Sequence, residues 1–396
     1  MADIKDLRVL IDRIPYAEGN LGEEAILASL LQDLRRIGVN KIAVLSNMPE
    51  RTQQRHGSDI KVIADHKGMW WRLPEIVKAH DILVWGGGHM LQDRSSQLYI
   101  PYVTKNLMLA RYFKKPRFIY APGLGPVEAD FGKWLSRLAI DGSDTIVVRD
   151  VESEQLLRDC RVRSDIQVTA DPVFSLTTEA DDISTARERK APVIGIAPRR
   201  HFYRKGNVLP VSMQFASGKQ ENPQFEFFLQ EIAGALDQLI LQDGAEVQFL
   251  PMDLGPNPRD DLICQRIRQF MVYGEKTVLY DDDAPLMEFI GRLGKLDVLI
   301  SARLHGIIMG MRFGLPFIGI DSDGKIPRLA GKFGVGDFVV IDAELRKEGL
   351  YDMARRAVNE NHELRTRLAA QNKEISNQSR QNYDFLEGCL NNLAVT

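Results

Sequence analysis

The chain has 396 residues, of which 44% are hydrophobic and 27% are charged, and its formal net charge at pH 7 is −3. These values are typical of globular proteins and exclude the overall basic surface that attracts nucleic acid, so no nucleic-acid partner is expected. The length predicts two domains, because a single hydrophobic core rarely serves so many residues.

The cysteines and apolar stretches bear on the cellular compartment. The three cysteines lie far apart and show no CxxC pair or zinc-ligand spacing, so we expect neither a disulfide framework nor a metal site. The first apolar run is interrupted by Asp12 and Arg13, and no later run reaches the roughly 18 residues of a membrane-spanning helix. We predict a cytoplasmic protein, and peripheral association with a membrane stays compatible with the sequence.

The first half of the chain alternates short β-branched runs with segments of helical period, a pattern typical of parallel sheets covered by helices. Between the first two runs, apolar residues recur at helical spacing from Ile26 to Ile37 and stop at Gly38, a typical helix-ending residue. We therefore predict an N-terminal domain over residues 1–178. Its strands are predicted at Arg8–Ile14, Lys41–Ser46, Asp81–Trp85, Arg117–Ala121, Thr145–Arg149 and Gln167–Ala170.

The second half repeats this alternation after a polar stretch, residues 179–190, which predicts a linker. A C-terminal domain is predicted over residues 191–345, and C-terminal helices over residues 346–396. Residues 202–222 are rich in Gly, Pro, Gln and Ser and predict a mobile or substrate-covering loop. Strands are predicted at Val193–Ala197, Glu246–Leu250, Thr277–Tyr280, Asp297–Ile300, Pro316–Ile320 and Phe338–Ile341.

Two glycine-rich segments follow predicted strands, where parallel α/β sheets bind their ligands. After the first strand, Gly19, Asn20 and Gly22 allow close backbone approach to an anion at a helix start, and a capped turn explains them equally well. The run of Gly86, Gly87 and Gly88 favours a ligand contact over a plain turn, because three consecutive glycines cost much conformational entropy. His89 and Asp93, which follow, are weak indications by themselves.

Charged residues at later strand ends are stronger candidates. Arg149 ends a strand, where a guanidinium suits a carboxylate or phosphate; a structural ion pair with Asp150 or Asp171 is nearly as plausible. Arg303 and His305 meet at a strand-to-helix transition and combine a fixed cation with an imidazole that titrates near neutral pH, which favours a functional role.

One strand later, Lys325 offers a further cation that could hold a phosphate. A solvated loop lysine is the commoner case at such a position.

Six motifs follow one another along residues 8–345. They are Gly-Asn-Leu-Gly-Glu-Glu-Ala-Ile (19–26), Trp-Gly-Gly-Gly (85–88), Ala-Pro-Gly (121–123), Val-Arg-Asp (148–150), Ala-Asp-Pro (170–172) and Ser-Ala-Arg-Leu-His-Gly (301–306). In this order they resemble the polysaccharide pyruvyltransferase family. The resemblance implies an α/β fold of two Rossmann-like domains facing across a cleft, similar to B-type glycosyltransferases. It also implies a transferase that moves the enolpyruvyl unit of phosphoenolpyruvate onto a sugar as a pyruvate ketal and releases phosphate.

By this resemblance, Arg149, Arg303, Leu304 and His305 fall on phosphoenolpyruvate-binding positions. We predict that His305, Arg303 and Arg149 are catalytic. The predicted substrate-binding residues are Leu304, Lys325, Gly19, Asn20, Gly22, Gly86, Gly87, Gly88 and Asp171. No cofactor is expected. The expected partners are phosphoenolpyruvate and a sugar or lipid-linked oligosaccharide of exopolysaccharide or cell-wall biosynthesis. The chain has Gly22-Glu23 where the family commonly has Gly-Asp, in the half expected to handle the acceptor.

Two alternatives stay open. A B-type glycosyltransferase would use the same Arg and His against the diphosphate of a nucleotide sugar, and a non-catalytic family member would bind glycan without turnover. An NAD-dependent enzyme is less favoured, because the three consecutive glycines lack GxGxxG spacing.

Overall fold

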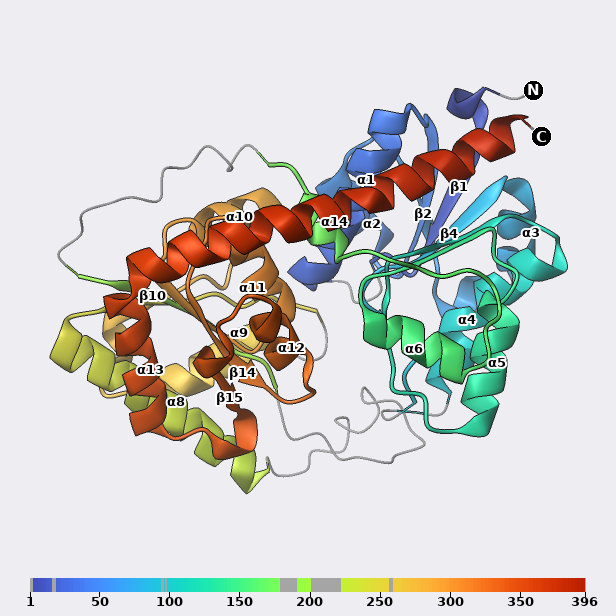
Figure 1. Ribbon diagram of the computed structural model, residues 1–396. Coiled ribbons are helices and arrows are strands. Elements are labelled where there is room, and N and C mark those ends of the chain that lie inside the picture. The colour runs from blue at the N-terminus through green and yellow to red at the C-terminus, as the bar shows by residue number, and fades with distance from the viewer. Residues whose placement is uncertain are drawn as a thin grey trace.

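The computed structural model describes residues 3–15, 19–93, 96, 98–178, 191–200, 222–255 and 259–395. Two parallel sheets form its two halves, as Figure 1 shows. The strand order is β3-β2-β1-β4-β6-β8-β9 in the first sheet and β12-β11-β10-β13-β14-β15 in the second. The predicted linker lies outside the described residues. So does the predicted loop, except for its last residue, Asn222, which caps the following helix.

The first half contains the following elements. Its strands are β1 (Arg8–Asp12), β2 (Lys41–Ser46), β3 (Lys61–Ala64), β4 (Ile82–Gly86), β6 (Arg117–Tyr120), β8 (Thr145–Val148) and β9 (Gln167–Val168). Its helices are η1 (Ile4–Asp6), α1 (Leu21–Ile37), α2 (Pro49–His56), η2 (Lys67–Arg72), α3 (Leu73–Ala79), α4 (Tyr99–Tyr112), α5 (Asp130–Ile140), α6 (Val151–Asp159) and η3 (Pro172–Ser175). A small separate sheet pairs β5 (His89–Met90) with β7 (Gly123–Leu124).

The second half has the same alternation of strands and helices. Its strands are β10 (Val193–Ala197), β11 (Glu246–Phe249), β12 (Val278–Leu279), β13 (Val298–Ser301), β14 (Phe317–Asp321) and β15 (Val339–Ile341). Its helices are α8 (Pro223–Asp243), α9 (Asp260–Phe270), η5 (Gly274–Lys276), α10 (Leu286–Leu293), α11 (Leu304–Met311), α12 (Lys325–Lys332), η6 (Gly336–Phe338), η7 (Asp342–Glu344) and α13 (Lys347–Asn359). The long helix α14 (Asn361–Val395) follows.

Every predicted strand is present, with ends that differ from the prediction by at most two residues. Strand β1 ends at Asp12 instead of Ile14, because Arg13 has a φ of 66°, in the left-handed region that ends an extended strand. Strand β8 ends before Arg149, which is therefore the first residue of the connection. Strand β3 was not predicted; it is a four-residue edge strand without a fully buried side chain, so its apolar signal is weak.

Helix α1 links the two halves through apolar packing. Its cap forms as expected, since the Asn20 side chain accepts a hydrogen bond from Gly22 N at 2.9 Å. Ile26, Leu30 and Leu34 are fully buried. The hydrophobic cluster that includes them continues into the core of the second sheet, so the two halves share one apolar core along this helix.

Helix α14 crosses both halves and ends near the N-terminus (Figure 1). Ser376, Ser379 and Asn382, three residues apart on one face, bind the segment of residues 169–175. Asn382 accepts from Thr169 Oγ1 at 2.6 Å and donates to the Ala170 carbonyl at 3.0 Å, and Ser379 donates to the Asp171 carbonyl at 2.9 Å. The helix therefore fixes the backbone on both sides of Asp171.

We expect Asn382→Ala to lower the free energy of unfolding by about 2 kcal/mol, because it removes two hydrogen bonds of a fully buried side chain. Urea unfolding measures this. Gln378→Ala, at an exposed position of the same helix, is the matched control and should change stability by less than about 0.5 kcal/mol. Equal losses in the two variants would contradict the role given to Asn382.

Candidate functional site

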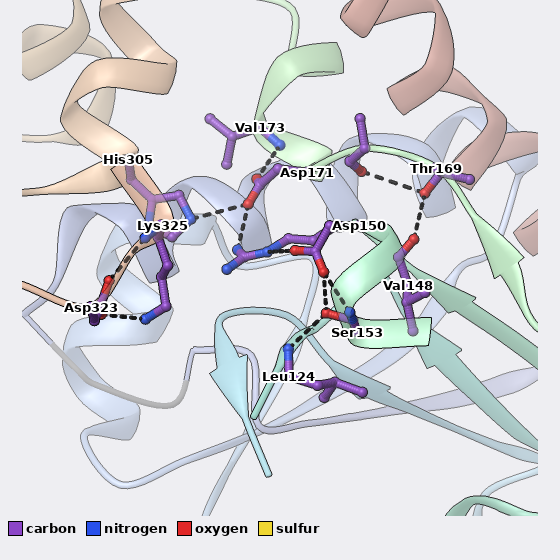
Figure 2. A network of polar contacts seen from close by, with 12 residues as sticks. Leu124, Val148, Asp150, Ser153, Thr169, Asp171, Val173, His305, Asp323 and Lys325 are labelled. Atoms are coloured by element: carbon purple, nitrogen blue, oxygen red, sulfur yellow. Dashed lines mark hydrogen bonds and ion pairs between the residues drawn. The ribbon is translucent and has the colours of Figure 1, made fainter. Parts of the chain in front are cut away.

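Asp171 binds side chains from both halves of the protein. Its carboxylate, which is buried, accepts a hydrogen bond from Arg149 Nη1 at 2.6 Å, and the same oxygen lies 3.4 Å from His305 Nε2. Its other oxygen accepts from Val173 N at 3.1 Å. Figure 2 shows this network, in which Asp171 lies between His305 of the second half and the residues of the first. The structure thus brings together three of the predicted site residues.

The charge of Asp171 depends on these neighbours. Burial alone would raise the pKa of the carboxyl group, but His305 and Arg149 hold the pKa far below its ordinary value. The group is therefore an anion at neutral pH, and it orients both the imidazole and the guanidinium.

Two glycines make room for these side chains. A Cβ atom on Gly22 would lie 2.4 Å from His305 Nδ1, and one on Gly123 would lie 2.2 Å from Arg149 Nη2. Gly22 was predicted as a backbone contact for a ligand, and in the structure it admits the imidazole of the opposite half. Gly123 was not in the predicted site, because the sequence alone does not show which side chain passes against it.

Lys325 adds a cation from the second half. It begins helix α12, and its Nζ lies 2.7 Å from Asp323 Oδ2. Burial lowers the pKa of Lys325, the Asp323 carboxylate raises it, and the nearby guanidinium groups of Arg199 and Arg149 lower it further. Arg149 and Lys325 therefore approach each other from opposite halves, which predicts a local site for an anion.

His89 belongs to the same group, although its sequence signal was weak. Burial, together with the positive charges of Lys325 and Arg149, lowers the pKa of this imidazole well below its ordinary value. The ring is therefore neutral at pH 7, and the lowered pKa makes it a weak base. Its position directly after Gly88 was the one available signal.

Arg303 lies against carboxylates of its own half. Its guanidinium makes a bidentate pair with the fully buried Asp260, with Nε to Oδ2 at 2.9 Å and Nη2 to Oδ1 at 2.5 Å, and Nη2 lies 3.4 Å from Asp253 Oδ2. Arg303 is also the residue that precedes helix α11, and Leu304 begins that helix and packs on the core. The predicted contact of Arg303 and Leu304 with substrate stays a prediction.

The first glycine segment joins the halves through the backbone. Leu254 N donates to the Gly19 carbonyl at 3.0 Å, and Leu21 N donates to the Met252 carbonyl at 2.8 Å. A Cβ atom on Gly19 would lie 2.5 Å from Gly255 N, so only glycine allows this approach. Gly19 and Asn20 thus have structural roles where the two halves meet. Their binding of substrate stays a prediction.

The second glycine segment, Gly86 to Gly88, packs closely against other segments of its own half. A Cβ atom on Gly88 would lie 2.2 Å from Glu23 Oε1, and one on Gly87 would meet the side chains of Ile14 and Ile26. Gly86 has a φ of 141° and lies against the Tyr120 carbonyl. Contact of these glycines with a ligand likewise stays a prediction.

Within the described ranges, no three His, Cys, Asp or Glu side chains are placed to hold a metal ion. None of the helices in this part of the chain is long and apolar enough to cross a membrane.

Sequence comparison places the chain beside one family. A family model described as polysaccharide pyruvyl transferase matches residues 20–324. No curated protein sequence matches the chain.

Solved structures with the same architecture include sugar-nucleotide enzymes. A UDP-N-acetylglucosamine 2-epimerase aligns with a TM-score of 0.61 at 12% identity, covering 96% of this chain and 95% of that chain. The UDP-GlcNAc 2-epimerase from Neisseria meningitidis bound to UDP-GlcNAc aligns with a TM-score of 0.58 at 14% identity, covering 96% of this chain and 98% of that chain. The spinosyn rhamnosyltransferase complexed with spinosyn aglycone aligns with a TM-score of 0.51 at 11% identity, covering 96% of this chain and 99% of that chain. These similarities confirm the predicted fold class, two Rossmann-like domains similar to B-type glycosyltransferases, and at such identities they concern the fold alone.

Asp171→Ala should lower the free energy of unfolding at pH 7 by about 3 kcal/mol, because it leaves the buried Arg149 guanidinium without its carboxylate. Asp171→Asn tests the charge. Because the folded pKa of Asp171 is depressed, its stabilisation is complete above the unfolded pKa of about 3.9 and is lost as the pH falls through the folded pKa.

The stability difference between the wild type and Asp171→Asn should therefore be full at pH 5 to 7 and shrink at pH 3. Urea unfolding at each pH measures it. Asp352→Asn, at an exposed position on α13, is the control. A difference that grows on acidification would contradict the assignment.

Proposed function

The chain belongs to the polysaccharide pyruvyl transferase family, and from this we propose that it transfers the enolpyruvyl unit of phosphoenolpyruvate to a sugar as a pyruvate ketal. The family makes it a transferase whose acceptor is a sugar or polysaccharide. The donor, the ketal product and a lipid-linked form of the acceptor in exopolysaccharide or cell-wall biosynthesis are parts of the proposal.

One observation carries the choice of donor: cations from opposite halves converge on the Asp171 network. Arg149 and His305 contact Asp171, and Lys325 lies near enough to Arg149 to have its pKa lowered by it. Phosphoenolpyruvate is a small molecule with a phosphate and a carboxylate, so it needs several cations within a short distance. The net charge of −3 supplies no such attraction from the chain as a whole.

The proposed reaction conserves both hydroxyl protons of the acceptor. The first sugar hydroxyl forms a bond from its oxygen to C2 of the enol while C3 gains a proton, so the methylene becomes a methyl group. The C2–O bond to phosphate then breaks with its electron pair on oxygen, and a neighbouring hydroxyl forms the second bond to C2. One hydroxyl proton ends on C3 and the other leaves with phosphate.

The roles follow from charge and position. Arg149 and Lys325 hold the phosphate and carboxylate, and His305, oriented by Asp171, exchanges protons with the reacting atoms. His89, neutral at pH 7, can form a hydrogen bond to a reacting oxygen without bringing a charge to it. Arg303 was predicted to hold the substrate; in the proposal it also fixes, through Asp260, the turn from which α11 and His305 begin.

The donor is tested by calorimetric titration of the full chain with phosphoenolpyruvate, UDP-glucose and GDP-mannose. We expect phosphoenolpyruvate to bind and Lys325→Met and Arg149→Ala each to weaken it by at least about tenfold, since each removes a charge-assisted contact. Arg303→Ala is titrated in the same way, because Arg303 was predicted to contact the substrate. Arg137→Ala, on the surface of α5, is the matched control. Selective binding of a nucleotide sugar would instead assign the chain to glycosyl transfer.

The proton-transfer role is tested by phosphate release with a panel of oligosaccharide acceptors. His305→Ala should lower the rate by at least about 100-fold, the usual contribution of general acid–base catalysis, while phosphoenolpyruvate still binds within a few-fold. His80→Ala, on the far side of the first half after α3, provides the control for removing a histidine. Full turnover by His305→Ala would remove this residue from the mechanism.

A further inference from the structure

Two tryptophans are exposed at the edge of the first sheet where its strands end. Trp70 and Trp71 lie in η2, which follows strand β3, and they are 37% and 74% exposed. Ligands of parallel sheets bind outside the carboxyl ends of the strands, and β4 and β8 lead into His89 and Arg149 at the same edge. Two adjacent exposed indoles at such an edge are informative, because large aromatic side chains are usually well buried.

The ring of Trp70 is supported from below. It lies 5.9 Å from the ring centroid of Tyr102, and Lys105 Nζ lies 5.3 Å from the Trp70 ring and 4.9 Å from the Tyr102 ring. Lys105 is itself held by both oxygens of Asp65, at 3.0 and 2.9 Å. These cation–π contacts and the ion pair fix the position of the aromatic rings.

The layer beneath is a buried, charge-balanced network. The Arg13 guanidinium lies 4.4 Å from the Tyr102 ring centroid and donates to Asp65 Oδ2 at 2.9 Å. Its Nε lies 3.4 Å from the buried Asp12. The cations Arg13 and Lys105 are thus matched by the carboxylates Asp12 and Asp65. Because these charges are paired with one another, the exposed indole rings are the feature that a ligand would contact here.

A pyranose ring has the required chemistry. Its C–H bonds carry partial positive charge and pack against the negative face of an indole, while its hydroxyl groups can reach the partly exposed Lys105. We propose that Trp70 and Trp71 form a platform for a sugar unit of the acceptor. This inference rests on the proposed function, since a sugar acceptor is what the transferase would need at this edge.

The contacts of the platform relate it to the proposed site. Trp70 lies against Tyr102, whose ring contacts Arg13, and Arg13 directly follows β1, the neighbour of β4 in the sheet. The platform therefore lies on the edge of the sheet from which β4 leads into His89, where an acceptor that extends beyond the reacting sugar can contact it.

The four tryptophans of the chain allow a direct test by ¹⁹F NMR of the full protein labelled with 5-fluorotryptophan. Trp85 is buried and Trp134, 55% exposed on α5, reports nonspecific surface binding. The resonances are assigned by single Trp→Phe variants, and the probes are maltopentaose, chitopentaose and xylopentaose with the corresponding monosaccharides. We expect a pentasaccharide to shift the Trp70 and Trp71 resonances and leave Trp134 unchanged. No shift at either residue with any probe, or an equal shift at Trp134, would overturn the inference.

Affinity provides a second readout. Trp71→Ala should weaken pentasaccharide binding by about tenfold, the effect of losing an aromatic contact, whereas Trp71→Phe should keep most of it. Trp134→Ala is the matched control. Equal weakening by the two alanine variants would overturn the platform. Phosphoenolpyruvate titrated into the same samples separates the two proposals. If sugars shift the Trp70 and Trp71 resonances but phosphoenolpyruvate does not bind, only the proposed donor is contradicted. If phosphoenolpyruvate binds but no sugar shifts these resonances, only the platform is contradicted.

Discussion

A buried carboxylate that contacts cations from two separate sheets is the constraint on which the rest of the site depends. Asp171 can remain ionised out of water only while Arg149 and His305 are present, because an unpaired buried charge is costly. This requirement explains why glycine occupies positions 22 and 123, where any side chain would displace the imidazole or the guanidinium. The geometry of the site therefore depends on the relative position of the two halves.

Helix α14 fixes the backbone that carries the Asp171 carboxylate, and this helix lies outside the segment that matches the family model. The family match ends at residue 324, whereas helix α14 begins at Asn361. Its Ser379 and Asn382 bind the backbone around Asp171, so the C-terminal helix supports a site built mostly from strand ends. Backbone hydrogen bonds between the Gly19 segment and the Met252 segment add a second connection between the halves. Helix α14 and these backbone hydrogen bonds therefore both fix the polar groups where the two halves meet.

The fold could be predicted from the alternation of apolar runs and helical segments, because that pattern is local. The positions of Arg149 and His305 could also be predicted, since strand ends are where such sheets bind ligands. The ion pair of Arg149 with Asp171 was named in the sequence analysis as an alternative, but other partners across the fold could not be predicted. Arg303 pairs with Asp260, 43 residues away, and nothing in the spacing indicates that pair. The altered pKa of His89 likewise depends on a lysine and an arginine from distant segments.

The fit of His305 onto Gly22 also limits how such proteins can be recombined. The imidazole belongs to one half and the glycine to the other, so each half carries a surface shaped by its counterpart. A chimera that joins the first half of one relative to the second half of another would keep this geometry only if the incoming first half has no side chain at that position. The two halves are thus a matched pair, and exchange between relatives is compatible with the site only when both members of the contact are retained.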